Sequence, residues 1–404
     1  MTAQQASNTF LALIIATLLA VMRVAPPAAL HPGVTAAAGS SRLSLLKEII
    51  LPGYIWSVAV TGDKAYAVDM DCESGGGLQV VDLTGEAGPR ARGRACGLAD
   101  GSNIMGIAAD GGIVALLPSH SYMPVLVDAR DPDHPKRGGS IELSRRLYFG
   151  PFMIREGRLV VRQHSAGADP DHVIVFDVSD PMAPRETGRM NLAPSGSEER
   201  SSAGLAAHQG VYYLVEGDLR VIKVDAAGVP SAIGSAPIPG RDLERSYVDH
   251  LAIDTVAQRL YAVDELHLWV YDIARPDAPK LLAAAVSPPL PEFDNHGLAF
   301  KVGDFVVRNN LAFATIKIWP DAEATLIVIL DMTDPAAPRQ VDVRLPFPFG
   351  GMGLDAIGNL IAVGSRDSHP STRGRLGVFG MVERQELTWR SWLPNLSTAS
   401  SGAP

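Results

Sequence analysis

The chain has 404 residues and a formal net charge of −9, and no run of basic residues is longer than two. This charge pattern lacks the basic surface of a nucleic-acid-binding protein, so no nucleic-acid partner is expected. A hydrophobic content of 47% is sufficient for a large core, and 39 Gly with 30 Pro indicate many turns between short strands.

The N-terminus has the character of an export signal. The uncharged apolar run Phe10–Met22 is shorter than the ~20 residues of a membrane span, and small residues suited to cleavage follow it. We therefore expect a signal peptide or an uncleaved signal anchor over residues 1–29 and a linker over residues 30–44. The protein is expected to be secreted, periplasmic or displayed on the cell surface. An uncleaved anchor would be its contact with a membrane.

One repeat unit dominates the rest of the chain. In His172–Leu192 an apolar strand ends at Asp177, an Asp-Pro turn follows, and a mixed polar and apolar strand resumes at Arg185. Asp177 can accept hydrogen bonds from the turn amides ahead of it, and Pro181 fixes the bend. The same pattern returns at Leu268–Val286 and Leu326–Leu345.

The repeat can be counted by the position of the turn aspartate. That column contains, in order, Asp82, Asp128, Asp177, Lys223, Asp272, Asp331 and Gly380. Subtraction gives spacings of 46, 49, 46, 49, 59 and 49 residues, and the long spacing includes an extra excursion through Trp319–Ala324. Seven units of this length, each with four strands, predict an all-β, seven-bladed β-propeller of antiparallel blades over residues 45–394.

Two segments compete to complete the last blade. Leu45–Leu51 is a strand without preceding partners, and it is suited to the outer edge of blade seven, where it would join the two ends of the ring. Glu386–Leu393 also has the pattern of a last strand. One of them must then be extra, displaced or a fifth strand. Residues 395–404 are small and polar, which predicts a disordered tail.

The turn motif resembles that of the LVIVD-repeat family of exported bacterial and archaeal proteins. The match is close at Val175–Pro184 and Leu330–Pro338, good at Tyr271–Pro279 and Val127–Pro135, and degraded in units one, four and seven. The resemblance covers roughly Leu45–Leu393. It implies a propeller and an exported or surface location, and it supplies no catalytic residues.

The chain has two cysteines, Cys72 and Cys96, and both fall in the first unit. In an exported protein they can form a disulfide, and the alternative is a pair of small buried side chains. We favour the disulfide.

The turn aspartates recur by position, which raises the alternatives of a metal array and of turn stabilisation. We favour turn stabilisation, because each aspartate can satisfy its own turn amides and because the column changes to Lys223 and Gly380.

The candidate ligand site lies where the inner strands begin, at the mouth of the central channel. Its predicted residues are Trp56, Asp249, His250, Asp294, Asn295 and His296. His and carboxylate groups on one rim can bind a divalent metal or form an acid-base pair, whereas the simpler alternative is hydrogen bonding at strand ends. Arg155 and Phe152 are weaker candidates for an anion-binding and a stacking group.

The sequence contains no Gly-x-Ser-x-Gly or His-Glu-x-x-His motif, phosphate-binding loop, CxxC or haem-attachment site. The sequence therefore favours a non-enzymatic extracytoplasmic binding module whose ligand is a protein, a small molecule or a glycan. The alternative is a metal-assisted hydrolase at the channel rim. No cofactor is predicted beyond a divalent metal for that alternative.

Overall fold

The computed structural model describes residues 42–72, 75–84, 88–100, 102–119, 124–141, 151–163, 170–192, 204–240, 248, 250–264, 267–287, 299–319, 325–344, 351–357, 359–366 and 373–382. They belong to one compact unit, Arg42–Val382. The expected signal segment, the alternative last strand Glu386–Leu393 and the expected tail lie outside these residues.

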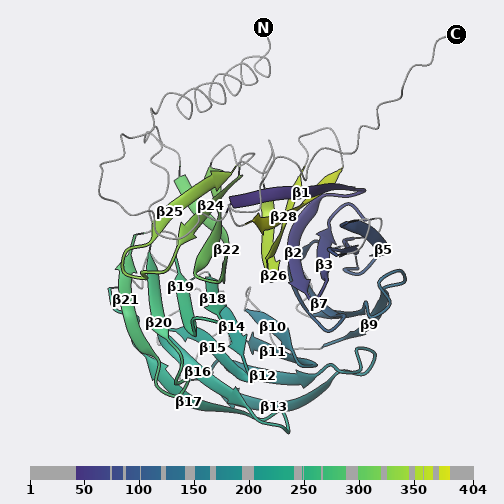
Figure 1. Cartoon of the computed structure of the whole chain (residues 1–404). Coiled ribbons are helices and arrows are strands. Elements are labelled where there is room, and N and C mark those ends of the chain that lie inside the picture. Colours follow the sequence, from purple (N-terminus) through teal and green to yellow (C-terminus); the bar gives the residue numbers. More distant parts are fainter. Residues whose placement is uncertain are drawn as a thin grey trace, which may run out of the picture. The chain divides into compact units, whose positions relative to one another are not determined.

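The unit is a seven-bladed β-propeller of four-stranded antiparallel sheets, as the sequence predicts (Figure 1). Blade 1 consists of β2 (Ile55–Thr61), β3 (Lys64–Asp69), β4 (Gly77–Asp82) and β5 (Arg90–Cys96). Blade 2 consists of β6 (Ile104–Asp110), β7 (Ile113–Pro118), β8 (Val125–Asp128) and β9 (Lys136–Ser140). Blade 3 consists of β10 (Phe152–Arg155), β11 (Arg158–Gln163), β12 (His172–Asp177) and β13 (Arg185–Asn191).

Blades 4 to 6 continue the pattern. Blade 4 consists of β14 (Leu205–His208), β15 (Val211–Glu216), β16 (Asp218–Val224) and β17 (Pro230–Ala236). Blade 5 consists of β18 (His250–Asp254), β19 (Arg259–Val263), β20 (Leu268–Asp272) and β21 (Lys280–Val286). Blade 6 consists of β22 (Ala299–Arg308), β23 (Leu311–Trp319), β24 (Thr325–Asp331) and β25 (Arg339–Arg344). Among the described residues, no helix is long and apolar enough to cross a membrane.

Blade 7 is completed by the N-terminal strand. Its sheet has the order β26 (Gly351–Ile357), β27 (Leu360–Arg366), β28 (Gly374–Val382) and β1 (Arg42–Leu51). β1 pairs antiparallel with β28 along its length, from Arg42 opposite Val382 to Leu51 opposite Gly374. The predicted closure by Leu45–Leu51 is therefore confirmed, and the strand begins three residues earlier, at Arg42.

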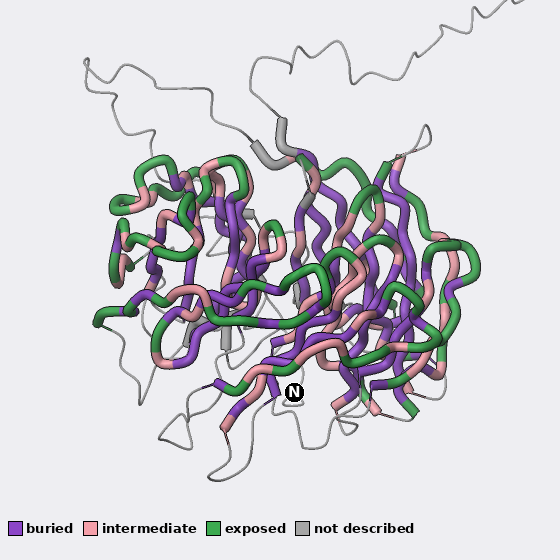
Figure 2. Tube along the Cα trace, turned by 90° about the horizontal axis from the view of Figure 1, so that it is seen from below, coloured by how far each residue is buried: buried purple, intermediate pink, exposed green. Residues whose placement is uncertain are grey.

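The seven blades form a closed ring around the inner strands. Each inner strand contacts that of the next blade, in the order β2, β6, β10, β14, β18, β22 and β26, and β26 returns to β2. The core consists of seven apolar clusters, one at each junction between neighbouring blades. Figure 2 shows the result, with buried residues along the strands and exposed residues in the outer turns. A sheet with two apolar faces is buried only between two neighbours, which is why the repeat assembles as a ring.

The extra length of the sixth unit lies partly in its first two strands. β22 and β23 have 10 and 9 residues, whereas β18 and β19 of blade 5 have 5 each. The sequence had placed the insertion in Trp319–Ala324, of which residues 320–324 lie outside the described ranges.

Antiparallel order places two kinds of turn on the same face of the ring. The turn between the first and second strands and the Asp-Pro turn between the third and fourth strands both lie there. We call this side the hairpin face. The connections between blades lie on the opposite face, to which the inner-strand starts predicted as a ligand rim also belong.

Candidate functional site

The turn aspartates stabilise their own turns. Asp128, Asp177, Asp272 and Asp331 each accept a hydrogen bond from the backbone amide two residues ahead, at 2.9–3.2 Å. In three blades the second aspartate of the motif does the same, at 3.0 Å. These carboxylates thus accept hydrogen bonds from the amides of their own turns on the hairpin face.

Hydrogen bonding keeps two of these carboxyl groups ionised. The Arg130 guanidinium lowers the pKa of Asp128, and the Ser179 hydroxyl and amide lower the pKa of Asp177. At Asp331 burial opposes the shift, but hydrogen bonds from Thr333 and Arg339 lower the pKa below its ordinary value.

Arginines at recurrent positions bridge three of the blade junctions. Arg158 and Arg259 are the first residues of the second strands β11 and β19, and each donates to backbone carbonyls in the Asp-Pro-type turn of the next blade. Arg92 occupies the bulge of the outer strand β5, where its Nε lies 2.7 Å from the Asp133 carboxylate of blade 2. These long side chains fill the hairpin face between blades.

Both positions hold aliphatic residues in blade 4, as they also do in blade 6 with Leu311 and Val341. Val211 stands first in β15, where Arg158 and Arg259 stand in β11 and β19. Ile233 is the bulged residue of β17, as Arg92 is of β5, and Asp277 of blade 5 matches Asp133 of blade 2. A cavity of about 440 Å³ opens at the junction of blades 4 and 5, within the range of ~300–1,000 Å³ typical of small-molecule sites.

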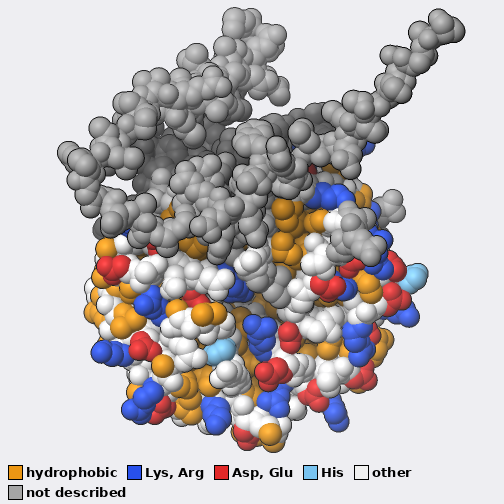
Figure 3. All heavy atoms as spheres, in the orientation of Figure 1, with side chains coloured by type: hydrophobic (Ala, Val, Ile, Leu, Met, Phe, Trp, Pro, Cys, Tyr) orange, Lys and Arg blue, Asp and Glu red, His pale blue; other side chains and the backbone are white. Residues whose placement is uncertain are grey.

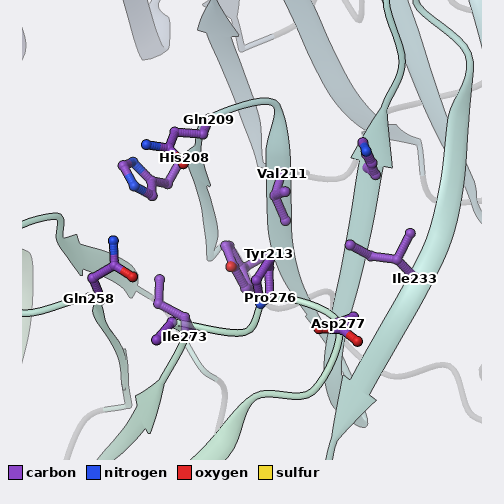
Figure 4. Close-up of a pocket in the computed structure, with 11 residues that line it drawn as sticks. His208, Gln209, Val211, Tyr213, Ile233, Gln258, Ile273, Pro276 and Asp277 are labelled. Atoms are coloured by element: carbon purple, nitrogen blue, oxygen red, sulfur yellow. The ribbon is translucent and has the colours of Figure 1, made fainter.

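We call this cavity the 4–5 groove. It is lined by His208, Gln209, Val211, Tyr213, Lys223, Ile233, Gln258, Ile273, Ala274, Pro276 and Asp277 (Figure 4). His208 and Gln209 lie on one side in this view, Ile233 and Asp277 on the other, and Tyr213 and Pro276 between them. The arrangement combines an apolar floor with polar groups at its ends.

The floor belongs to the aromatic core of this junction. Tyr213 is 1% exposed and Ile273 is 5% exposed, and both pack in one cluster with Trp269 and Tyr271. The Trp269 indole donates to the Pro239 carbonyl at 2.9 Å, and the Tyr271 hydroxyl donates to the Pro237 carbonyl at 2.8 Å. The aromatic core in which the floor residues pack is therefore joined to blade 4 by two hydrogen bonds from blade 5.

Two polar groups of the groove have distinctive surroundings. The buried Nε2 atom of His208 has no hydrogen-bond partner among the described residues. Burial raises the pKa of Tyr213 to about 12, so its phenol stays neutral at physiological pH. An unpaired buried ring nitrogen costs free energy.

The groove was missed by reasoning from sequence alone. One signal was visible, because Lys223 interrupts the aspartate column in the blade that borders the groove. The lining comes from separate strands and turns of blades 4 and 5, and its convergence is visible only in the three-dimensional structure.

Most of the predicted rim site is not described. Asp249, Asp294, Asn295 and His296 lie outside the described residues, so that site stays a prediction. His250 is the first residue of β18 and is half-buried.

The structure describes the contacts of Trp56 and of the two weaker candidates, Arg155 and Phe152. Trp56 lies at a bulge near the start of β2, packs against the junction of blades 1 and 2, and meets Tyr54 edge-on with ring centroids 6.1 Å apart. Arg155 ends β10, and its guanidinium nitrogen is 3.6 Å from a carboxylate oxygen of Asp110. Phe152 packs into the junction of blades 2 and 3.

Within the described ranges, no group of three or more His, Cys, Asp or Glu side chains is arranged to hold a metal ion. Cys72 and Cys96 are joined by a disulfide, with Cα atoms 5.2 Å apart, at the edge of blade 1. Figure 3 shows Lys and Arg side chains interspersed with Asp and Glu over the visible part of the surface.

No family model and no curated protein sequence matches this chain. Solved structures do match it in fold. A protein of unknown function from Desulfotomaculum acetoxidans DSM 771 superimposes with a TM-score of 0.51 at 12% identity, over 77% of this chain and 89% of its own. A candidate 6-phosphogluconolactonase from Bacteroides fragilis NCTC 9343 gives a TM-score of 0.51 at 10% identity, over 76% of this chain and 87% of its own. At these identities the likeness shows the fold alone.

Proposed function

We propose that this chain is an extracytoplasmic binding protein whose ligand site is the 4–5 groove on the hairpin face. The observation that carries the proposal is the cavity itself, which brings His208, Lys223 and Asp277 together beside an apolar floor. Concave sites with an apolar surface and a few polar groups are the usual form of ligand sites.

The extracytoplasmic location rests on two features. The Cys72–Cys96 disulfide fits an oxidising compartment, and the Phe10–Met22 run has the length of a signal-peptide core. The turn motif supports placement among the LVIVD-repeat proteins. The alternative of a metal-assisted hydrolase depends on the rim residues, and no described contact favours it.

The groove can be tested by filling it with an arginine side chain, as Arg92 does at the junction of blades 1 and 2. Ile233→Arg copies Arg92 and brings a guanidinium toward Asp277, whereas Val341→Arg makes the same kind of change at the matching bulge of blade 6, where Val341 is 36% exposed. Thermal shift measurements would use the full chain and a panel of neutral sugars, sugar acids, amino acids, dicarboxylates and sugar phosphates.

At least one compound class should raise the melting temperature of the wild type and of Val341→Arg. A ligand at 100 times its Kd stabilises the native state by about 2.7 kcal/mol, which such a scan detects. Ile233→Arg should bind that class at least tenfold more weakly while it melts as cooperatively as the wild type. A panel without any ligand, or equal binding to Ile233→Arg, would overturn the proposal.

A further inference from the structure

We infer that the 4–5 groove binds a neutral, hydroxyl-rich molecule, namely a mono- or disaccharide unit, an inference that rests on the proposed function. It follows from three properties of the lining: balanced charge, groups that both donate and accept hydrogen bonds, and an apolar floor.

The formal charges of the lining cancel. Of its residues, Lys223 carries a positive charge and Asp277 a negative one. A site for an anion would need an excess of donors or positive charge, and a site for a cation an excess of carboxylates. Neither excess is present.

The remaining polar groups can both accept a hydrogen bond from a hydroxyl group and donate one to it. Gln209 and Gln258 each offer an amide donor and a carbonyl acceptor, and both are exposed at hairpin turns. A neutral imidazole has one donor and one acceptor nitrogen, and His208 adds such a ring to the lining. A sugar hydroxyl donates one hydrogen bond and accepts others, so these three side chains match it.

The floor suits the less polar face of a sugar ring. Pro276 and Ile233 are partly exposed and present ring and methyl surface, above the buried side chains of Tyr213, Ile273 and Val211. A pyranose has C–H groups on its faces and hydroxyls at its edge. It can therefore cover this floor while its hydroxyls reach the polar ends, whereas a fully charged small ion would leave the apolar surface unused.

The test compares ligands that differ in charge and little in size. Calorimetric titrations of the full chain would use glucose, galactose, N-acetylglucosamine, maltose and cellobiose as neutral probes, with glucuronate and glucosamine as the charged counterparts of glucose. Variants are Lys223→Gln, Asp277→Asn, His208→Ala and Gln258→Ala, with Ile233→Arg as the blocked groove and Val341→Arg as its matched control.

At least one neutral sugar should bind tenfold or more tightly than either charged counterpart. Its affinity should stay within threefold in Lys223→Gln, and should fall at least tenfold in His208→Ala, in Gln258→Ala and in Ile233→Arg. Retained cooperative melting shows that each variant is folded.

Other outcomes would overturn the inference. Tightest binding of glucuronate that is lost in Lys223→Gln identifies an anion site, and tightest binding of glucosamine that is lost in Asp277→Asn identifies a cation site. A second outcome is that no sugar binds, but another compound class of the panel binds and Ile233→Arg abolishes its binding. In that case the saccharide inference is wrong, and the groove is still the binding site. If no compound distinguishes the wild type from Ile233→Arg, the proposed function fails as well.

Discussion

An aspartate at the end of the third strand stabilises its own turn in four of the blades, and at Asp331 it also joins the turn to the outer strand. Asp331 accepts from the Thr333 amide at 2.9 Å and from the Arg339 guanidinium at 2.6 Å, so one carboxylate ties the turn to the outer strand. Its lowered pKa means that the folded state prefers the ionised form. The recurrence of aspartate is therefore explained by turn geometry.

This role makes a prediction about acid. Because the folded pKa of Asp331 lies below its unfolded value, its contribution is complete above the unfolded value of ~4 and is lost as pH falls through the folded pKa. Asp331→Ala should reduce the free energy of unfolding by about 1 to 2 kcal/mol at pH 7, and by less at pH 3. Urea titrations at the two pH values measure both differences.

Asp331→Asn is the control for that experiment. It keeps an oxygen that can accept from the Thr333 amide and removes the charge that pairs with Arg339. At pH 7, Asp331→Asn should lose less free energy of unfolding than Asp331→Ala loses. If Asp331→Ala loses the same free energy of unfolding at pH 7 and at pH 3, a role for the ionised carboxylate is contradicted.

At the scale of elements, the outer strand of one blade is shaped by the turn of the next. Gly93 in β5 donates its amide to the Pro132 carbonyl of blade 2 at 2.8 Å, and Gly139 in β9 donates to Pro181 of blade 3 at the same distance. A side chain at Gly93 would meet the Asp133 carbonyl, and one at Gly234 would meet that of Asp277. Glycine here permits the close approach of a neighbouring turn.

We therefore expect Gly93→Ala to be costly. The added methyl group must displace the Asp-Pro turn of blade 2, which should lower the free energy of unfolding by about 1 to 3 kcal/mol. Chemical denaturation measures this loss, and Arg90→Ala on the same strand, where the Arg90 side chain is 60% exposed, provides the comparison. Equal stability of the two variants would argue against close packing of that turn.

These elements also show what could be predicted and why the rest could not. The strands, the seven units and the turn role of Asp177 follow from short-range patterns, and the structure contains all three. The bridge from Arg92 to Asp133 spans 41 residues, and the packing of Gly93 depends on the register of two separate blades. The 4–5 groove belongs to this second kind, because its lining comes from strands and turns of two separate blades.

At the scale of the whole molecule, stability depends on closing the ring. β1 supplies the fourth strand of blade 7, and Leu51 and Ile49 pack in the cluster shared by blades 7 and 1. Asp355 of blade 7 also accepts from the Val60 amide of blade 1 at 2.6 Å. The two ends of the array are thus joined by both strand pairing and packing.

Two neighbouring residues of β1 test this closure. Leu51 is 1% exposed, whereas Ile50 is 59% exposed. Leu51→Ala should lower the free energy of unfolding by about 2 to 5 kcal/mol, and Ile50→Ala by less than ~0.5 kcal/mol. Guanidinium denaturation of the two variants gives the comparison, and similar losses would mean that β1 does not close the ring as described.

The central claim is that the 4–5 groove is the ligand site, and isoleucine methyl NMR of the full chain tests it most directly. Ile233 and Ile273 line the groove, whereas Ile55 and Ile361 lie in the junctions on either side of blade 7. On titration with the neutral sugars, we predict that the methyl signals of Ile233 and Ile273 shift in a saturable way while those of Ile55 and Ile361 stay in place. Saturable shifts at Ile55 or Ile361 with no change at Ile233 and Ile273 would contradict the account.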